Sequence, residues 1–190
     1  MTATQQWFGE YFSQLHPSLQ KLHTHGGSLS GDVQIEFGTG ISGFFGRKMA
    51  KKLGVPTEEG NHQLQVTIAH IENELHWSRC FNNTKIFNSI FTPVGNKPTG
   101  YWIEKSGPIQ LNLTVDIKDQ GWYWQPEKVK FRGIPLPMWL LPKTTAYKKI
   151  ESGKYRFTVN FSLSLFGKIL TYSGLLTPEI NSPTNNPTSL

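Results

Sequence analysis

The residues of this chain that could do chemistry are an arginine and a glutamate that each alternate with aromatic side chains. Arg79 lies between Trp77 and Phe81, so the three side chains share one face if the segment is a strand. Glu104 shares a face with Trp102 on a later segment. An unpaired charge is costly to bury, so we expect Arg79 and Glu104 to form an ion pair partly shielded from water. Such a pair would anchor the head group of a ligand, or it would be purely structural.

Two more aromatic side chains complete a candidate ligand site, Trp139 and Tyr172. Trp139 belongs to the apolar segment 133–142, whose three prolines predict neither a regular strand nor a helix. We expect this segment to be a lid-like loop that flanks the mouth of a cavity, with its apolar side chains packed onto the barrel, a ligand or a partner. The full candidate set is Trp77, Arg79, Phe81, Trp102, Glu104, Trp139 and Tyr172.

No catalytic motif of known mechanism is present. The serines have no nucleophile-elbow context, and the six histidines show no spacing that would hold a metal on a helix. Gly38-Thr39-Gly40 lacks the third glycine of a dinucleotide-binding fingerprint. We therefore predict no catalytic residue, no cofactor and no metal site. Cys80 is the one cysteine, which excludes a disulfide within the chain.

Alternating strands are the elements that must position these residues. Residues 109–117 and 155–165 are apolar at every odd position and polar at every even one, which predicts strands with one dry face. Turn residues separate one such segment from the next. The predicted strands cover residues 62–71, 74–82, 85–93, 100–106, 108–118, 122–132, 145–152, 154–165 and 168–176.

This order favours a mainly β fold, a lipocalin-like antiparallel barrel or half-barrel of about nine to ten strands. A helix-grip fold is the rival, but the prolines after residue 177 exclude its long C-terminal helix. Before the sheet, residues 5–24 predict two short helices with Pro17 in the first turn of the second, followed by a strand over 28–37 and a helix over 41–53. We expect a single domain over 1–177 and a disordered or extended tail over 178–190.

Several short patterns in order resemble a known family: Leu15-His16-Pro17, Trp77-Ser78-Arg79-Cys80-Phe81, Glu104-Lys105-Ser106-Gly107-Pro108, Lys154-Tyr155-Arg156-Phe157 and Tyr172-Ser173-Gly174, together with the segment 133–142. Over roughly residues 14–178 the chain is similar to an uncharacterised bacterial family, the domain of unknown function number 4166. Members of that family occur alone or fused behind a saccharopine-dehydrogenase-like oxidoreductase. The resemblance implies a possible oxidoreductase partner, and it carries over no activity and no catalytic residue.

The formal net charge is +6, but the basic residues are scattered, and clusters such as Lys148-Lys149 are short. No run reaches the five or six like charges of a nucleic-acid-binding arm, so we expect a solvated surface and no nucleic-acid partner. Neither a signal peptide nor a transmembrane segment is evident, which favours a cytoplasmic protein.

The function that these patterns favour is a non-enzymatic binding module for a small apolar or amphipathic ligand in a barrel cavity. Two alternatives stay open at this point. One is a small enzyme or an accessory domain to an oxidoreductase, with Arg79 and Glu104 at its reactive end. The other is a protein-interaction module that uses the proline-rich apolar loop. Large aromatic side chains could also fill the barrel and leave no cavity.

Overall fold

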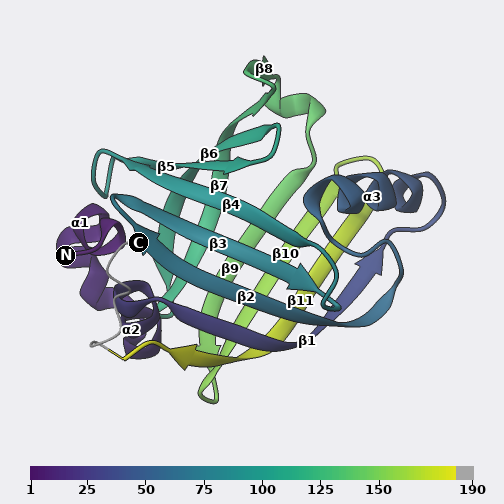
Figure 1. The fold of residues 1–190 in the computed structure, drawn as a ribbon. Coiled ribbons are helices and arrows are strands. Elements are labelled where there is room, and N and C mark those ends of the chain that lie inside the picture. The colour runs from purple at the N-terminus through teal and green to yellow at the C-terminus, as the bar shows by residue number, and fades with distance from the viewer. Residues whose placement is uncertain (183–190) are drawn as a thin grey trace.

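A computed structural model describes residues 1–182 as a closed antiparallel β-barrel (Figure 1). Its single sheet has the order β6-β5-β4-β3-β2-β1-β11-β10-β9-β7-β8, and a further pairing of β6 with β7 closes the ring. Only the short β8 lies outside that ring. The strands are β1 (Gly27–Phe37), β2 (Gly60–Ile71), β3 (Glu74–Phe81), β4 (Ile86–Val94), β5 (Tyr101–Ser106), β6 (Ile109–Lys118), β7 (Gly121–Phe131), β8 (Ile134–Leu136), β9 (Lys143–Glu151), β10 (Lys154–Leu163) and β11 (Gly167–Ile180).

The predicted barrel is therefore confirmed, and the half-barrel and helix-grip alternatives are wrong, because β6 and β7 join the two halves of the sheet. The predicted strand faces are also correct. Leu113 and Val115 are buried on β6, and Phe157 and Val159 on β10 pack against the same core. Leu165 is the exception. It lies in the turn after β10, where its side chain is 90% exposed.

The N-terminal segment plugs one end of the barrel with α1 (Ala3–Phe8), the 3-10 helix η1 (Gly9–Gln14) and α2 (Pro17–His25) (Figure 1). As predicted, Pro17 occupies the first turn of α2, where a backbone N–H is not needed. The His16 side chain caps the helix by accepting a hydrogen bond from the Ser18 backbone N–H at 3.1 Å. Phe8 packs edge-on against Trp122, which ties the plug to the core.

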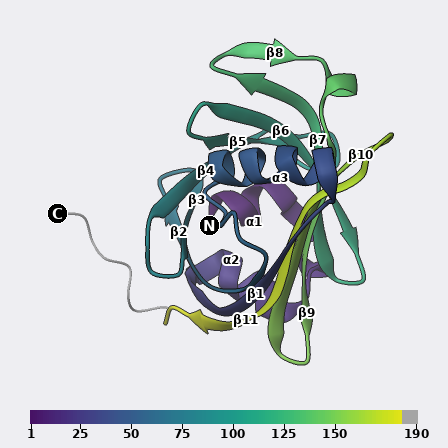
Figure 2. The same cartoon turned by 90° about the vertical axis from the view of Figure 1, so that its right-hand side faces the viewer.

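The helix α3 (Gly40–Leu53) lies across the opposite end of the barrel (Figure 2). Gly43 and Gly46 weaken a helix in isolation. Here they let α3 pack directly against the backbone of the preceding loop and of β11. A Cβ atom at Gly43 would lie 2.2 Å from the Gly38 carbonyl oxygen, and one at Gly46 would lie 2.2 Å from the Ile169 carbonyl oxygen. None of the described helices is long and apolar enough to cross a membrane.

The proline-rich segment 133–142 differs from the prediction. The segment 133–142 forms β8, which pairs with β7, and a 3-10 helix η2 (Met138–Leu140), although three prolines had argued against both. Pro135 is tolerated because β8 is an edge strand with one neighbour.

The first three residues of the predicted tail, 178–180, belong to a strand. β11 continues to Ile180, and Pro178 pairs with Leu29 of β1 only, since β10 leaves β11 after Leu176. The rest of the predicted tail, residues 183–190, lies outside the described residues.

Candidate functional site

A cavity of about 80 Å³ lies inside the barrel between its two helical ends. Side chains from most sides of the ring contribute to its wall, so no single strand defines it. The lining residues are Leu29, Leu64, Val66, Trp77, Arg79, Phe81, Trp124, Ala146, Tyr147, Lys148, Tyr155, Phe157, Val159, Tyr172 and Leu176. The wall is apolar and aromatic apart from two cationic and three phenolic side chains. That composition is typical of a site for a small organic ligand.

Arg79 and Glu104 are linked through two serines and do not contact each other directly. Arg79 Nη2 donates to Ser89 Oγ at 2.8 Å, and Ser106 Oγ donates to Glu104 Oε1 at 2.9 Å. The hydroxyls of Ser89 and Ser106 lie 2.5 Å apart and complete the chain. The predicted direct ion pair is therefore wrong, as no salt bridge joins the two residues in the described part of the chain. The reason is that β4 lies between β3 and β5, which separates the two backbones by roughly 10 Å.

Tyr172 faces the same charged groups from β11. Burial raises the pKa of the Tyr172 phenol, the charge of Glu104 raises this pKa further, and the charge of Arg79 lowers it. The hydroxyl therefore stays protonated at neutral pH. With Arg79 it forms a polar end to a cavity whose remaining wall is mostly apolar.

Lys148 is an interior residue that sequence reasoning missed. Its side chain is 2% exposed, and its Nζ lies 2.8 Å from Nε2 of His23, which α2 inserts from the plugged end. The same Nζ lies 3.6 Å from the ring centroid of Trp122 and 4.5 Å from that of Trp77. Burial without a carboxylate partner holds the pKa of Lys148 well below its ordinary value. The pKa of His23 is also well below its ordinary value, first because of burial and then because of the nearby charges of Lys148 and His70.

A signal for Lys148 was present in the sequence. Residues 146, 148 and 150 share one face of β9, and two of them are the apolar Ala146 and Ile150. Alternation thus places Lys148 inside and Lys149 outside. Reading the two lysines together as a charge cluster concealed this difference.

Three buried hydrogen-bond donors on the cavity wall have no partner among the described residues. They are Nε1 of Trp77, Nε of Arg79 and the hydroxyl of Tyr155. Buried polar groups are nearly always hydrogen-bonded, and each one left unpaired costs about 1–3 kcal/mol. The residues of the cavity wall therefore carry unpaired donors, which a ligand with hydrogen-bond acceptors would satisfy.

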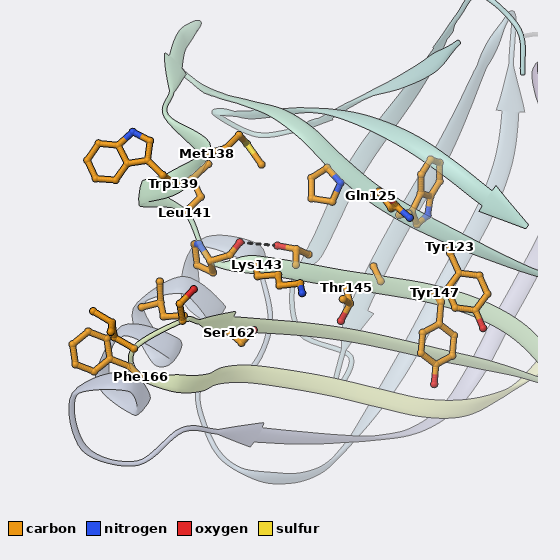
Figure 3. Close-up of a pocket in the computed structure, with 18 of the residues that line it drawn as sticks. Tyr123, Gln125, Met138, Trp139, Leu141, Lys143, Thr145, Tyr147, Ser162 and Phe166 are labelled. Atoms are coloured by element: carbon orange, nitrogen blue, oxygen red, sulfur yellow. Dashed lines mark hydrogen bonds between the residues drawn. The ribbon is translucent and has the colours of Figure 1, made fainter. Parts of the chain in front are cut away.

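A groove of about 860 Å³ runs along the outside of the barrel wall where β7 and β9 separate (Figure 3). These strands pair only through residues 122–124 and 146–148, because the chain leaves β7 to form β8 and η2 before it returns as β9. Tyr123 and Tyr147 stack at one end of the groove, and Trp139 and Phe166 flank the other.

The groove and the cavity adjoin each other. Trp124, Ala146 and Tyr147 line both of them. The paired residues 124 and 146 of β7 and β9 therefore form a wall that both spaces share.

The structure brings most of the predicted site residues together. Trp77, Arg79, Phe81 and Tyr172 all line the cavity. The other three lie elsewhere.

Trp102 is buried against Trp7 and Trp122 near the plugged end and lies outside the cavity lining. Glu104 reaches the site through the serine pair. Trp139 lines the groove with 82% of its surface exposed. Ile134 and Leu140 are also exposed, so these loop side chains do not pack onto the barrel, and their packing onto a ligand or a partner stays a prediction.

A comparison with family models gives one match, to a domain of unknown function, DUF4166, over residues 15–176. The chain belongs to this family. The DUF4166 match begins just before α2 and ends within β11, so it spans the whole barrel and the capping helix that carries His23. No curated protein matches the chain.

Proposed function

We propose that this DUF4166 protein is a binding module that holds a small amphipathic ligand, with an acceptor-rich or acidic head group inside the barrel and an apolar tail in the groove. The observation that carries this proposal is the donor excess of the cavity. Trp77, Arg79 and Tyr155 line one mostly apolar space, and each carries a donor without a partner among the described residues.

The head group is assigned from charge. Arg79 lines the cavity, and Glu104 is linked to it only through Ser89 and Ser106, while Lys148 adds an amine whose pKa is lowered by burial. A carboxylate ligand would accept hydrogen bonds from Arg79 directly, and charge-assisted bonds of this kind are about twice as strong as neutral ones.

The size of the site supports a tail that leaves the barrel. A cavity of about 80 Å³ has room for several water-sized groups, and the adjoining groove is about 860 Å³. Ala146 has the smallest side chain of those that line both spaces, so we propose that the tail passes there.

The test is a titration of tryptophan fluorescence with straight-chain carboxylic acids of increasing length and with their methyl esters. The acids should quench saturably and bind more tightly than the esters. Arg79→Gln should weaken binding of the acids by about tenfold or more, and Ala146→Phe should block it. Arg156→Gln is the matched control, because Arg156 pairs with Glu151 outside the cavity.

Two outcomes contradict the proposal. One is the absence of saturable quenching at every chain length. The other is equal affinity of the Arg79→Gln variant and the parent protein for the acids.

A second candidate function, an interaction surface, is favoured by the apolar loop itself. Ile134, Trp139 and Leu140 expose 67%, 82% and 58% of their surfaces. Pull-down with and without Trp139→Ser tests whether this loop carries a stable protein contact, and an unchanged set of bound proteins would exclude it.

A further inference from the structure

Most of the exposed large apolar side chains of the barrel gather at the end that carries α3. Three connections at this end contribute them, and we call this set the apolar rim: Ile41, Phe44 and Phe45 of α3; Ile134, Trp139 and Leu140 of the β8–η2 segment; Leu165 and Phe166 of the β10–β11 turn. Figure 2 faces the end that carries α3, and Lys52 of α3 lies near Phe131, where β7 ends and the chain turns into β8. Single exposed apolar residues are ordinary, whereas a set from three connections marks an interaction site.

The rim is surrounded by positive charge. α3 carries Arg47, Lys48, Lys51 and Lys52, and the adjacent end of β7 carries Lys128, Lys130 and Arg132. Lys52 Nζ lies 5.7 Å from the Phe131 ring, so the two clusters are neighbours.

The rim end also carries carboxylates, among them Glu58 and Glu127, but they are fewer than its basic residues and partly neutralised. Glu36 pairs with Lys168 at 2.6 Å, and Glu59 lies 3.8 Å from Arg47. At the plugged end, acidic and basic residues balance. The acidic ones are Glu10, Glu72, Glu74, Asp116, Asp119, Glu151 and Glu179, and the basic ones are Lys21, Lys97, Lys118, Lys149, Lys154 and Arg156. The excess positive charge of the chain is thus concentrated at the rim.

We propose that the apolar rim docks on an anionic lipid bilayer. Aromatic and aliphatic side chains flanked by lysine are the side chains that enter the boundary between head groups and acyl chains, while the ammonium groups meet the phosphates. α3 shows this arrangement within two turns. Its Gly43, Gly46 and Ala50 face the barrel, and Phe44 projects outward with Lys48 Nζ 4.4 Å from its ring.

A protein partner fits this surface less well. Lysine is depleted in protein–protein interfaces, yet here it borders every apolar group on α3. The apolar groups also lie on three separate connections that end the barrel, which suits shallow insertion into a lipid surface.

Docking in this orientation would place a bilayer next to the ligand site, an inference that rests on the proposed function. Trp139, Leu165 and Phe166 belong to both the rim and the groove. A bilayer at the rim would therefore meet the open end of the groove, and an amphipathic molecule could pass between bilayer and barrel without entering water.

The test is flotation of the purified protein with vesicles of phosphatidylcholine alone and of phosphatidylcholine mixed with phosphatidylglycerol. The protein should float with the anionic vesicles, and high salt should weaken the association because it screens charge. Lys48→Glu with Lys51→Glu should reduce vesicle affinity by about tenfold or more. Phe44→Ser with Phe45→Ser should do the same at unchanged charge.

Matched controls come from the plugged end, where Lys154→Glu and Ile71→Ser make the same chemical changes at exposed positions. These controls should keep the parent affinity. Equal flotation with neutral and anionic vesicles, no flotation at all, or parent-like flotation of the rim variants would each overturn the proposal. So would a concentration-dependent dimer that the rim variants abolish, because the rim would then be covered by a second copy.

Failure of docking and failure of the proposed function are separable. Rim variants should still bind carboxylic acids in the fluorescence titration without vesicles. Arg79→Gln should lose that binding and still float with anionic vesicles.

Discussion

The protonation state of Lys148 is the feature of the interior that an experiment can examine most directly. Two effects compete at its Nζ. The indole rings of Trp122 and Trp77, at 3.6 Å and 4.5 Å, favour a cation, and such contacts are worth about 2 kcal/mol or more when desolvated. Against this, burying an ammonium group without a carboxylate costs several kcal/mol even after relaxation. The cost of burial is the larger, which is why the pKa of Lys148 lies well below its ordinary value.

The consequence for stability has a definite sign. A lysine with a lowered folded-state pKa is neutral in the folded protein at pH values where the unfolded chain is still protonated. The free energy of unfolding therefore rises with pH, by up to about 1.4 kcal/mol per pH unit, until the ordinary pKa of lysine near 10.4 is reached. Over the two pH units between 7.5 and 9.5 this one side chain can add at most about 3 kcal/mol. Both limits lie below pH 10, so the buried tyrosines, whose pKa values are raised, do not oppose the trend.

Urea unfolding of the parent protein and of Lys148→Met, followed by tryptophan fluorescence at both pH values, measures this contribution. The parent should gain stability over the interval, and the variant should lack that gain. Lys149→Met is the control, since Lys149 lies on the outer face of β9 and pairs with Glu151 at 2.8 Å. If Lys148→Met and the parent show the same pH dependence, the lysine is charged in the folded state, and the reasoning from desolvation is refuted.

Three further outcomes follow from burial and backbone contact. Leu113→Asp should abolish the cooperative urea transition, because it places a carboxylate at a core position that is 3% exposed. Asn112→Asp, on the other face of β6, should unfold like the parent. A native-like transition for Leu113→Asp would contradict the barrel register. Gly46→Ala should lower the melting temperature, although alanine normally stabilises a helix, because its Cβ would lie 2.2 Å from a carbonyl oxygen; a raised melting temperature would mean that α3 does not rest on β11. His23→Gln should reduce the loss of stability that urea unfolding measures as the pH falls from about 6.5 to 5. The lowered pKa of His23 makes the neutral histidine favour the folded state, and this contribution is lost when the unfolded chain takes up a proton. An unchanged loss would assign the acid sensitivity to other groups.

Local pattern was enough to predict the strands and their faces. The alternation through residues 109–117 places Leu113 inside because successive side chains of any strand point to opposite faces, whatever the rest of the chain does. Pro17 and Gly26 delimit α2 for equally local reasons, a fixed φ at the start and a positive φ at the end. Arg79, Trp77 and Phe81 were placed on one face of β3 by the same argument, and all three line the cavity.

Only the tertiary structure could decide which side chains meet inside the ring. His23 and Lys148 are 125 residues apart in the sequence. Their side chains meet because α2, at the plugged end, packs next to β9. The link from Arg79 to Glu104 depends on β4, which supplies Ser89 between them. The groove and the cavity approach each other at Ala146 because β7 and β9 pair through only three residues each before the chain turns to β8. Each of these facts depends on the order in which strands pair around the barrel, a long-range property that the period-two pattern of an isolated strand does not contain.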